Sequence, residues 1–508
     1  MSDGATPTLE SYDLVPYESI PIPATHPDAL AAVARLAGLS PPPINGCRVL
    51  ELGAASGGNL IPMAFYRPGN EYVGVDLSLR QVEEGQALIA ALGLDHVHLL
   101  HRDVAAGLED LGRFDYVIAH GLYSWVPAPL RERLLELIAK VLAPRGIAYV
   151  SYNTLPGWRA RAMVRDMLLA HVGTARHPRA RLALAQEFLA RMAPAFAALE
   201  TPEAGLMAQE LAYLRTAPAG YLYHEYLEAE NEPVLFSTFL AQAQAAGLAY
   251  VGDAEPATDL GQGLDAAARA AVADYPLPRR LQYYDFLALR PFRRSLLTPL
   301  SAGEPVLDCA RIAELALFAD LSSDEEIDLS RDTPQAFRSA TRTAFQASHP
   351  LTKAALVVLA ERFPSAVAYG ELAAAAQAVV RAHGDARLAQ EDQRLATELA
   401  ALAGHRLVGL APDPQEWAVQ PAPRPRLHTM ARHQVSQGLA PAGIRHSALE
   451  LDEAARALAL LCDGEHDLPA LASAMRNRWP DFSPEETLVG CARLLWTFAR
   501  NGLLEPIP

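Results

Sequence analysis

The sequence predicts an α/β protein in which a sheet covered by helices is followed by mostly helical accessory domains. Between residues 48 and 153, short apolar runs alternate with helical patterns, which is typical of a parallel sheet. After residue 158 the pattern changes to long stretches rich in Ala, Leu and Arg. A chain of 508 residues is also too long for a single hydrophobic core, so several domains are expected.

The first third of the chain contains five short apolar runs bounded by turn residues, and each predicts a strand. They are Arg48–Leu52, Tyr72–Leu77, Val97–Arg102, Phe114–Ala119 and Ile147–Tyr152. A helix is predicted over Pro129–Leu142, because its apolar residues recur at helical spacing and Pro144 and Gly146 follow it. Upstream, His26–Leu39 predicts a short Ala-rich helix.

The rest of the chain divides by composition. Long helices are expected over Trp158–Glu200 and again over residues 345–405, with a mixed segment rich in Tyr and Phe at about 210–297. Five prolines between Pro412 and Pro425 indicate that Val408–Arg426 is an exposed linker. A last helical unit is expected at about 447–504.

Composition excludes several classes of protein. With 51% hydrophobic and 20% charged residues, the chain has the balance of a globular protein. A net charge of -16 and the lack of a basic stripe with interleaved aromatics argue against a nucleic-acid partner. The acidity suits a cationic substrate, although solubility alone is the more common reason for it.

Cysteine usage and hydropathy set further limits. The four cysteines are far apart and form no CxxC pair, so neither a metal site nor a disulfide framework is expected. No run of about 18 uncharged apolar residues is present, so no membrane insertion is expected. The start of the chain lacks the basic and apolar regions of a signal peptide, and we expect a cytoplasmic protein.

The strongest local signal is the segment Val49–Leu60. A strand runs into a turn of small residues that opens a helix, so that the backbone can approach a ligand closely. The residues of this turn placed to contact the ligand are Gly53, Ala54, Gly57 and Asn59. The same layout holds a dinucleotide in dehydrogenases, so the turn alone does not choose the cofactor.

Three acidic residues at successive strand ends help to distinguish a dinucleotide from S-adenosylmethionine as the cofactor. Glu51 lies just before the turn, where a carboxylate is unfavourable beside two phosphates but favourable near the cationic methionine end of S-adenosylmethionine. Asp76, followed by Leu77, is placed to accept hydrogen bonds from ribose hydroxyls in either cofactor. At the third strand end, Asp103 could hold the adenine amino group and Val104 could cover the ring.

These residues together predict a methyltransferase that uses S-adenosylmethionine. Each acid alone is more often a helix cap or a solvated turn residue. All three fall at the ligand-binding edge of the predicted sheet, which favours the functional interpretation. No phosphate-binding loop ending in Gly-Lys-Ser/Thr is present, which argues against a nucleotide triphosphatase.

The loops after the fourth and fifth strands should lie at the same edge. Tyr152 could orient or deprotonate an acceptor amine, Asn153 could accept a hydrogen bond, and Tyr123 and Trp125 could bracket its cation. His120 could equally contact the cofactor or act as a base. The alternative is that the aromatic residues are core residues that close the sheet.

The chain resembles a known group on these motifs. Residues 49–64, 120–127 and 151–158, with Tyr12-Asp13, Pro16-Tyr17 and His26-Pro27, are similar to class I methyltransferases that carry a methyltransferase regulatory domain. That group includes bacterial protein-lysine methyltransferases acting on outer-membrane proteins. The segments similar to the regulatory domain are Tyr223–Leu227, Asn231–Phe236, Gly247–Ala254 and Asp285–Arg293. The similarity is looser beyond residue 340, at Pro350–Ala354 and Leu461–Glu465.

The resemblance implies a Rossmann-like, seven-stranded sheet whose last strand is antiparallel, an inserted dimerisation element and a lysine acceptor. Carried over by position, Glu51, Gly53, Gly57, Asp76, Asp103 and His120 would line the cofactor. Tyr12 and Tyr17 would belong to an N-terminal lid over it. Ala55 departs from the commoner Gly-x-Gly form of the loop by one methyl group. His224-Glu225 does not start a zincin motif, because residue 228 is Glu.

The expected domains follow from the pattern and the resemblance together. They are an N-terminal lid and helix (1–45), a methyltransferase core (46–158), a helical insertion for dimerisation (159–210), a regulatory segment that completes the core (211–300), a middle helical and winged-helix-like domain (301–410) and a C-terminal helical domain (426–508).

The expected function is methyl transfer from S-adenosylmethionine to lysine side chains of a protein substrate, by a homodimer. One alternative is a methyltransferase for a small molecule, which a closed lid over a small pocket would favour. Another is a regulatory protein that binds the cofactor without turnover, which a blocked acceptor channel would favour.

Overall fold

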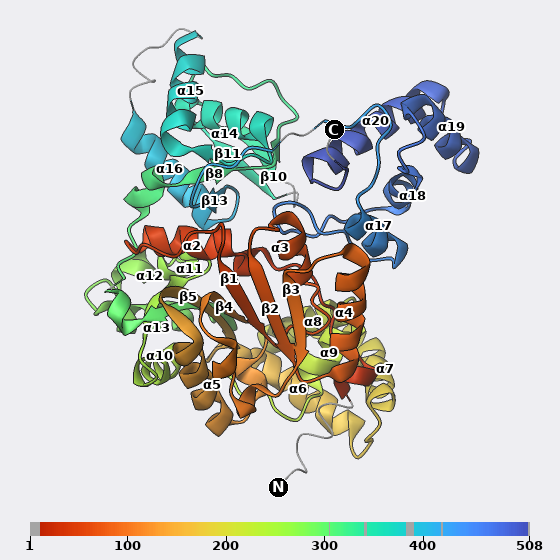
Figure 1. Ribbon diagram of the computed structural model, residues 1–508. Helices are drawn as coiled ribbons and strands as arrows, with labels where there is room; N and C mark the ends of the chain where they lie inside the picture. The colour runs from red at the N-terminus through yellow and green to blue at the C-terminus, as the bar shows by residue number, and fades with distance from the viewer. Residues whose placement is uncertain (1–10, 304, 340–342, 383–390, 418–419, 506–508) are drawn as a thin grey trace. The chain divides into compact units, whose positions relative to one another are not determined.

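The computed structural model describes residues 11–303, 305–339, 343–382, 391–417 and 420–505 (Figure 1). The chain divides into two compact units. The first unit holds Met1–Ser19, Pro41–Leu60 and Gly69–Pro305. The second unit holds Ile20–Ser40, Ile61–Pro68 and Val306–Pro508. The sequence-based N-terminal domain is therefore shared between the units, and its first ten residues lie outside the described residues.

The first unit is built on a seven-stranded sheet with the strand order β3-β2-β1-β4-β5-β7-β6. Its strands are β1 (Arg48–Leu52), β2 (Glu71–Asp76), β3 (Val97–His101), β4 (Phe114–Ala119), β5 (Leu142–Asn153), β6 (Leu248–Asp253) and β7 (Phe292–Pro299). All neighbouring strands are parallel except those that pair with β7, which is antiparallel to both β5 and β6. The prediction of a seven-stranded sheet with an antiparallel last strand is confirmed.

The strand order reverses at β1. The chain moves outward from β1 to β2 and β3, then returns to place β4 on the other side of β1. In a parallel sheet, the loops at the carboxyl ends of the two strands flanking such a reversal separate and leave room for a ligand. Residue Glu51 in β1 is paired with Gly74 of β2 and with Ile118 of β4, so it lies at this position.

Helices cover the sheet because its central strands are apolar on both faces. Leu50 and Val117 are fully buried, and a strand buried on both sides must be covered by packed elements. The helices of the first unit that follow these strands are α4 (Leu79–Leu92), α5 (Ala128–Val141), α10 (Phe236–Ala245) and α13 (Leu277–Leu287), with short helices α11 (Pro256–Asp259) and α12 (Ala266–Ala270). Helix α3 (Leu60–Tyr66) follows β1 in the chain and belongs to the second unit from Ile61 onward. In Figure 1, α4 lies beside β3 and α5 lies on the side of β4 and β5.

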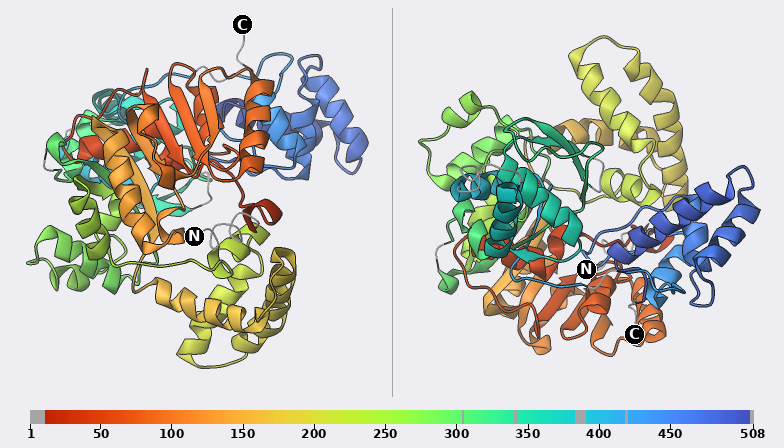
Figure 2. Two further views of the ribbon diagram at one scale, coloured as in Figure 1. Left: turned by 60° about the horizontal axis from the view of Figure 1, so that its bottom comes forward. Right: turned by 90° about the horizontal axis from the view of Figure 1, so that it is seen from above.

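A second group of helices belongs to the first unit. They are α6 (Trp158–Val172), α7 (Pro178–Ala197), α8 (Pro202–Leu214) and α9 (Ala219–Tyr226). The stretch predicted as helical over Trp158–Glu200 is thus two helices separated at Gly173, whose φ of 58° ends α6. Val164, Leu168 and Leu211 are fully buried and hold the group together. Figure 2 shows these helices, in ochre to yellow-green, projecting from the sheet.

The second unit is mostly helical, with two small sheets. Its helices are α2 (Pro27–Leu36), α14 (Pro350–Arg362), α15 (Tyr369–Ala382), α16 (Asp392–Gly404), α17 (Thr429–Ser436), α18 (Glu453–Leu461), α19 (Leu468–Arg478) and α20 (Pro484–Arg500). Its strands are β8 (Ala316–Phe318), β9 (Leu321–Ser322), β10 (Gln335–Ser339), β11 (Ala344–Ala347), β12 (Val367–Ala368) and β13 (Gly409–Ala411). None of the described helices is long and apolar enough to cross a membrane.

The linker predicted over Val408–Arg426 is wrong in its first part. Gly409–Ala411 forms β13, which is antiparallel to β8, and Ala411 is fully buried. Farther along, Gln415 pairs with Ala366 in an isolated bridge. The prolines suggested exposure, but none of them lies within the strand, so the backbone of 409–411 is free to pair.

Candidate functional site

The turn after β1 has the close-packed geometry that its small residues predict. Gly53 and Ala54 donate backbone N–H groups to the carbonyl of Val75, at 2.9 and 3.1 Å. Gly53 and Gly57 have φ angles of 74° and 80°, a region that favours glycine. The turn is therefore bound to the end of β2 and presents its backbone at the carboxyl edge of the sheet.

Asp76 holds this turn through both carboxylate oxygens. Its Oδ2 accepts the N–H of Ala55 and its Oδ1 accepts the N–H of Ser78, each at 2.8 Å. Burial raises the pKa of the Asp76 carboxyl above its ordinary value, although the backbone donors oppose that rise. Because each oxygen has a further lone pair, Asp76 could still accept hydrogen bonds from a ribose. We propose that Asp76 both contacts the cofactor and fixes the shape of the turn after β1.

Ala55 is held in an unfavourable backbone conformation. Its φ is 49°, in the left-handed region where the Cβ of an L-residue approaches the following carbonyl, at a cost of about 1–2 kcal/mol. The cost is offset by the hydrogen bond that its N–H donates to Asp76. The structure thus explains the departure from the Gly-x-Gly form: the methyl group is accommodated, with strain.

Replacing Ala55 by glycine is expected to stabilise the protein. The strain disappears, while glycine adds some entropy to the unfolded chain, so the free energy of unfolding should rise by about 0.5–1 kcal/mol. Urea denaturation followed by circular dichroism measures this change. Gly46→Ala provides the reverse control, because Gly46 has a φ of 77° and no atom within 4 Å of an added Cβ. A destabilised Ala55→Gly variant would contradict the assignment of strain.

Glu51 is buried with half of its carboxylate unpaired. The side chain is 4% exposed, and its Oε1 accepts a hydrogen bond from Asn59 Nδ2 at 2.7 Å. Its Oε2 is buried without a hydrogen-bond partner. Burial raises the pKa of Glu51 to about 8, because the charged form loses its hydration. A buried acceptor of this kind needs a donor or a cation, and the ammonium and sulfonium of S-adenosylmethionine supply one.

The ionisation of Glu51 predicts how cofactor affinity depends on pH. Protonated Glu51 is neutral, as glutamine is, whereas ionised Glu51 attracts a cation. The association constant for S-adenosylhomocysteine in the wild type, divided by that in Glu51→Gln, should therefore rise with pH and level off above about 8, at roughly tenfold. Calorimetry from pH 6 to 9 tests this, and titration of the ligand itself cancels in the ratio. A ratio that stays flat contradicts a direct ionic contact.

The residues predicted around the adenine differ in exposure. Leu77 is 39% exposed and Val104 is partly buried, so both present apolar surface near the ends of β2 and β3. Asp103 is exposed, and its Oδ1 accepts the N–H of Ala105 at 2.8 Å. Asp103 thus caps a short turn, and its contact with an adenine amino group remains a prediction.

His120 directly follows β4 and lies beside two hydroxyl groups. Its Nδ1 lies 2.9 Å from the hydroxyl of Tyr149 and 3.4 Å from that of Ser151. Burial, with the nearby Arg294, lowers the pKa of His120 to about 4. The imidazole is therefore neutral at physiological pH, and its tautomer is set by these hydroxyl groups. This arrangement fits a neutral contact better than a cationic one.

Two of the predicted catalytic aromatics are core residues. Tyr123 is fully buried and Tyr152 is 1% exposed, and both pack against Phe239. The Tyr152 hydroxyl lies 2.9 Å from Ser295 Oγ, whereas the Tyr123 hydroxyl donates to Gln242. Because both hydroxyl groups are engaged, neither is free to contact a methyl-accepting amine in this arrangement. The structure therefore favours the alternative interpretation, in which these aromatic residues are core residues that close the sheet.

The other two residues predicted to contact the acceptor amine are Trp125 and Asn153. Trp125 is partly buried and its Nε1 lies 3.9 Å from the position of a Cβ added to Gly121. Asn153, at the end of β5, is 2% exposed and donates from Nδ2 to Asn231 Oδ1 at 3.1 Å. Asn153 therefore positions the segment around Asn231, a connection that sequence reasoning missed.

The N-terminal segment reaches the cofactor loops. Ser19 Oγ accepts the N–H of Gly58, and Ser78 Oγ donates to Asp13, each at 2.7 Å. A Cβ on Gly58 would lie 1.9 Å from the carbonyl oxygen of Ser19, so the segment requires glycine there. Tyr12 is stacked on His224, with ring centroids 4.2 Å apart, and Tyr17 is 38% exposed. This geometry is consistent with the predicted lid, and its closure over the cofactor remains a proposal.

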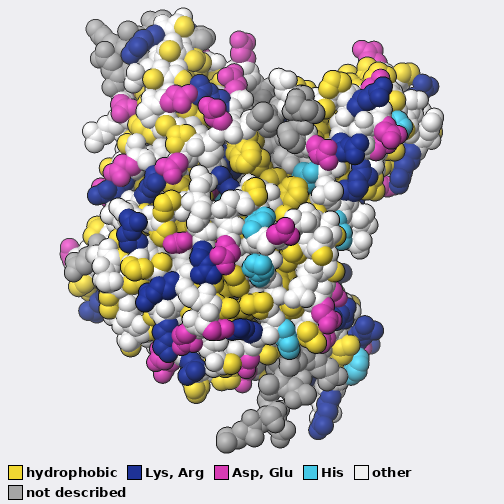
Figure 3. Space-filling view, in the orientation of Figure 1, with side chains coloured by type: hydrophobic (Ala, Val, Ile, Leu, Met, Phe, Trp, Pro, Cys, Tyr) yellow, Lys and Arg dark blue, Asp and Glu magenta, His cyan; other side chains and the backbone are white. Residues whose placement is uncertain are grey.

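Among the residues that the structure describes, no group of three or more His, Cys, Asp or Glu side chains is arranged to hold a metal ion. On the face shown in Figure 3, basic and acidic side chains are interspersed, and the coloured residues form no continuous basic stripe.

Three family models match the chain. A methyltransferase domain matches residues 50–148, a predicted methyltransferase regulatory domain matches residues 218–298, and a PKMT C-terminal winged helix domain matches residues 423–481. The first runs from within β1 to within β5 and includes the turn described above. The second covers α9, α10, β6 and all of β7 except its last residue.

Curated relatives and solved structures are similar to parts or most of the chain. Uncharacterized protein RP028 of Rickettsia prowazekii (strain Madrid E) is 34% identical over 234 residues, which cover 46% of this chain and 94% of the relative. Uncharacterized protein RP789 of the same organism is 37% identical over 287 residues, and the chain spans about half of its length. The structure of PKMT2 from Rickettsia typhi has a TM-score of 0.82, with 24% identity, and covers 96% of this chain and 100% of that one. A second structure of PKMT2, in complex with AdoHcy, has a TM-score of 0.81.

Proposed function

This chain belongs to the S-adenosylmethionine-dependent methyltransferases that carry a methyltransferase regulatory domain, and from that premise we propose that it methylates lysine side chains of proteins. The observation that carries the choice of acceptor is the match of residues 423–481 to the winged helix domain of protein-lysine methyltransferases. The likeness of the fold to PKMT2 over 96% of the chain supports it.

The residues of the site divide the work of the reaction. S-adenosylmethionine, when bound, supplies a methyl group made electrophilic by its positive sulfur. Glu51 would hold the cationic methionine end, and Asp76, through its hold on Ala55 and Ser78, would shape the turn around the nucleoside. Leu77 and Val104 would cover the adenine. The protein thereby aligns donor and acceptor and need not form a covalent intermediate with either.

Transfer of labelled methyl groups to a lysate of the source cell tests the acceptor. We expect label in protease-sensitive material that is stable to base, because N-methyl groups survive alkali and methyl esters of carboxylates do not. Amino-acid analysis should then find methylated lysine. Asp76→Ala serves as the control for label that does not depend on this site. Label confined to small molecules would favour the alternative acceptor, and base-labile label on protein would contradict a lysine acceptor.

We also propose that the helices α6–α8 form a dimer interface. Several large apolar side chains of these helices and their connections are exposed, and a partner could cover them. They are Met163 (46%), Leu199 (57%), Leu206 (44%) and Tyr213 (47%). Light scattering after size exclusion should find a dimer at micromolar concentration. Leu206→Glu should shift it towards monomer, whereas Leu439→Glu, on an exposed leucine of the second unit, should not; a monomeric wild type would contradict the proposal.

A further inference from the structure

The helix α9 and the N-terminal segment form one joined element. His224 of α9 is buried, with Nε2 2.6 Å from the carbonyl oxygen of Val15 and Nδ1 3.0 Å from Glu228 Oε1. Tyr12 stacks on the ring of His224, and a Cβ on Gly220 would lie 2.5 Å from the carbonyl oxygen of Pro16. Glu225 follows His224 in α9. None of the contacts just described involves its side chain.

Two sets of contacts bring this element to the cofactor edge. From the N-terminal segment, Asp13 accepts the hydroxyl of Ser78, next to Asp76. From α9, the carbonyl of Glu225 accepts a hydrogen bond from Asn231 Nδ2 at 3.0 Å, and Asn231 in turn accepts from Asn153 at the end of β5. The backbone of Glu225 is therefore linked, through two amide side chains, to the end of β5, which lies at the same edge of the sheet as the turn after β1.

Three tyrosines lie around the turn of α9 that carries Glu225. Tyr221 is four residues earlier in α9 and so shares a helix face with Glu225. The rings of Tyr12 and Tyr17 lie against His224, the residue before Glu225, with ring centroids 4.2 and 5.9 Å from that of His224. Tyr17 is 38% exposed, which leaves the group open to solvent on one side. We call Tyr12, Tyr17, Tyr221 and Glu225 the tyrosine–glutamate cluster.

The Glu225 carboxylate lacks a partner in this cluster. Among the described residues, it makes neither a hydrogen bond nor a salt bridge. Arg161 is the charged residue that acts on it, but Arg161 is engaged by Glu210 at 3.6 Å and by the hydroxyl of Tyr221 at 3.4 Å. Burial raises the pKa of Glu225 to about 8. A cation placed beside it would satisfy the carboxylate, and tyrosine faces attract cations as well.

We propose that the tyrosine–glutamate cluster receives the ammonium group of the acceptor lysine, with Glu225 as the residue that recognises its charge. The proposal rests on the proposed function, because it assigns a binding site to the lysine acceptor. A side chain that is neutral, or that carries a carboxylate, would leave Glu225 unpaired or repelled. The cluster therefore selects for a cationic acceptor.

The same contact supplies a destination for the proton that must leave before transfer. The lysine ammonium gives one proton to a carboxylate oxygen of Glu225, and the nitrogen keeps the electron pair. That pair forms the new N–C bond as the C–S bond of the sulfonium breaks and its electrons remain on sulfur. The products are a methylated ammonium, neutral S-adenosylhomocysteine and protonated Glu225, so atoms and charge balance.

The proposed role of the tyrosine–glutamate cluster can be tested by comparing the affinities of the protein for two peptides, in the absence of methyl transfer. The probes are a lysine peptide from the mapped acceptor and the same peptide with norleucine, which keeps the chain but lacks the charge. With S-adenosylhomocysteine bound, wild type should bind the lysine peptide at least about tenfold more tightly than the norleucine peptide. Glu225→Gln should reduce this ratio to about one, while Glu230→Gln, on an exposed glutamate five residues later, should keep it.

Two further measurements keep the outcomes distinct. Affinity for S-adenosylhomocysteine should be unchanged in Glu225→Gln, which shows that the site is folded, and Glu225→Asp should restore part of the ratio. An unchanged ratio in Glu225→Gln, with wild type methylating lysine, overturns this inference but leaves the proposed function standing. Failure of the wild type to methylate any lysine overturns the proposed function instead.

Discussion

Replacing Asp76 by alanine is expected to raise the dissociation constant for S-adenosylmethionine by at least about 100-fold, equivalent to about 2.7 kcal/mol. The variant loses the carboxylate that accepts the N–H groups of Ala55 and Ser78 at 2.8 Å. Each charge-assisted bond contributes about 1.5–3 kcal/mol, and Ala55 would have nothing to hold it at a φ of 49°. The turn that presents its backbone to the cofactor would then relax.

Isothermal titration with S-adenosylhomocysteine measures the effect, and Asp76→Asn is the matched control. Asparagine keeps the size of the side chain and one accepting oxygen, so it should lose less affinity than alanine. Circular dichroism should show that the fold of Asp76→Ala persists, because the sheet does not depend on this turn. Normal affinity in Asp76→Ala would overturn the assignment of the site.

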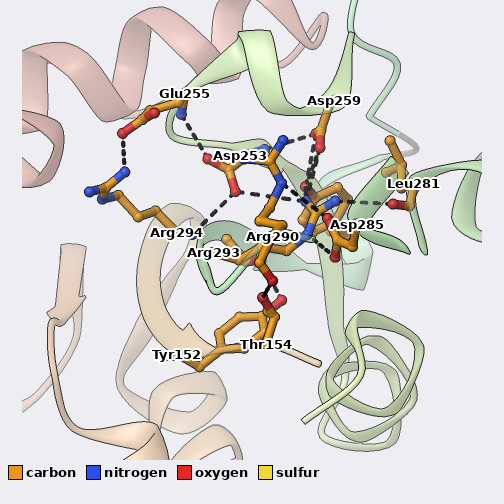
Figure 4. A network of polar contacts seen from close by, with 12 residues as sticks. Tyr152, Thr154, Asp253, Glu255, Asp259, Leu281, Asp285, Arg290, Arg293 and Arg294 are labelled. Atoms are coloured by element: carbon orange, nitrogen blue, oxygen red, sulfur yellow. Dashed lines mark hydrogen bonds and ion pairs between the residues drawn. The ribbon is translucent and has the colours of Figure 1, made fainter. Parts of the chain in front are cut away.

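Replacing Arg293 by methionine is expected to lower the free energy of unfolding by roughly 3–5 kcal/mol. Arg293 is fully buried in β7 and its guanidinium is surrounded by acids (Figure 4). It donates to Asp285 at 2.8 Å and to Asp259 at 3.1 Å, and it lies 3.7 Å from Asp253. Removing this shared cation would leave the buried Asp253 and Asp259 without the charge that compensates them, while Asp285 would keep its ion pair with Arg290 at 3.1 Å.

The neighbouring Arg294 provides the control. It is paired with Glu255 on a partly exposed side of the same strand, so Arg294→Met should cost about 1 kcal/mol or less. Urea denaturation of both variants compares the two arginines. Adding Asp259→Asn to Arg293→Met should recover part of the loss, because one uncompensated charge is removed. A loss below about 1 kcal/mol in Arg293→Met would show that the network does not stabilise the fold.

The pH dependence of Arg293→Met has a definite sign. Burial already raises the pKa of Asp253 in the wild type, and loss of Arg293, which opposes that rise, should raise it further. The folded variant then binds more protons than the unfolded chain, so its stability is greatest at low pH and falls as the pH rises towards the folded pKa. The gap in stability between wild type and variant should therefore widen from pH 6 to pH 8.

Local sequence patterns were sufficient for the sheet and for part of the site. The first four predicted strands agree with β1 to β4 within one residue at each end, because a strand buried on both faces must be a short apolar run between turn residues. The fifth is also present, but β5 begins at Leu142, five residues before the predicted start. Gly53 and Gly57 mark the turn for a similar reason, since positive φ favours glycine. Glu51 stood out as an acid inside an apolar strand, and its buried, half-paired carboxylate accords with that signal.

Contacts between segments that are far apart in the sequence could not be predicted from local sequence patterns. Tyr123 and Tyr152 follow strand ends as functional residues do, yet Phe239, more than eighty residues later, encloses both. The role of Glu225 depends on Asn231 and Asn153 and on a segment near residue 12, and no local pattern relates these positions.

The sequence by itself therefore determined the fold class, the cofactor and the position of the turn that would hold it. Each depends on residues that are neighbours in the chain and obey local rules of backbone geometry. Only the tertiary structure decided which polar and aromatic side chains are core, which are paired and which remain free to meet a ligand. The reason is physical: burial and pairing depend on what the rest of the chain places around a side chain, as Arg293 among its three aspartates shows.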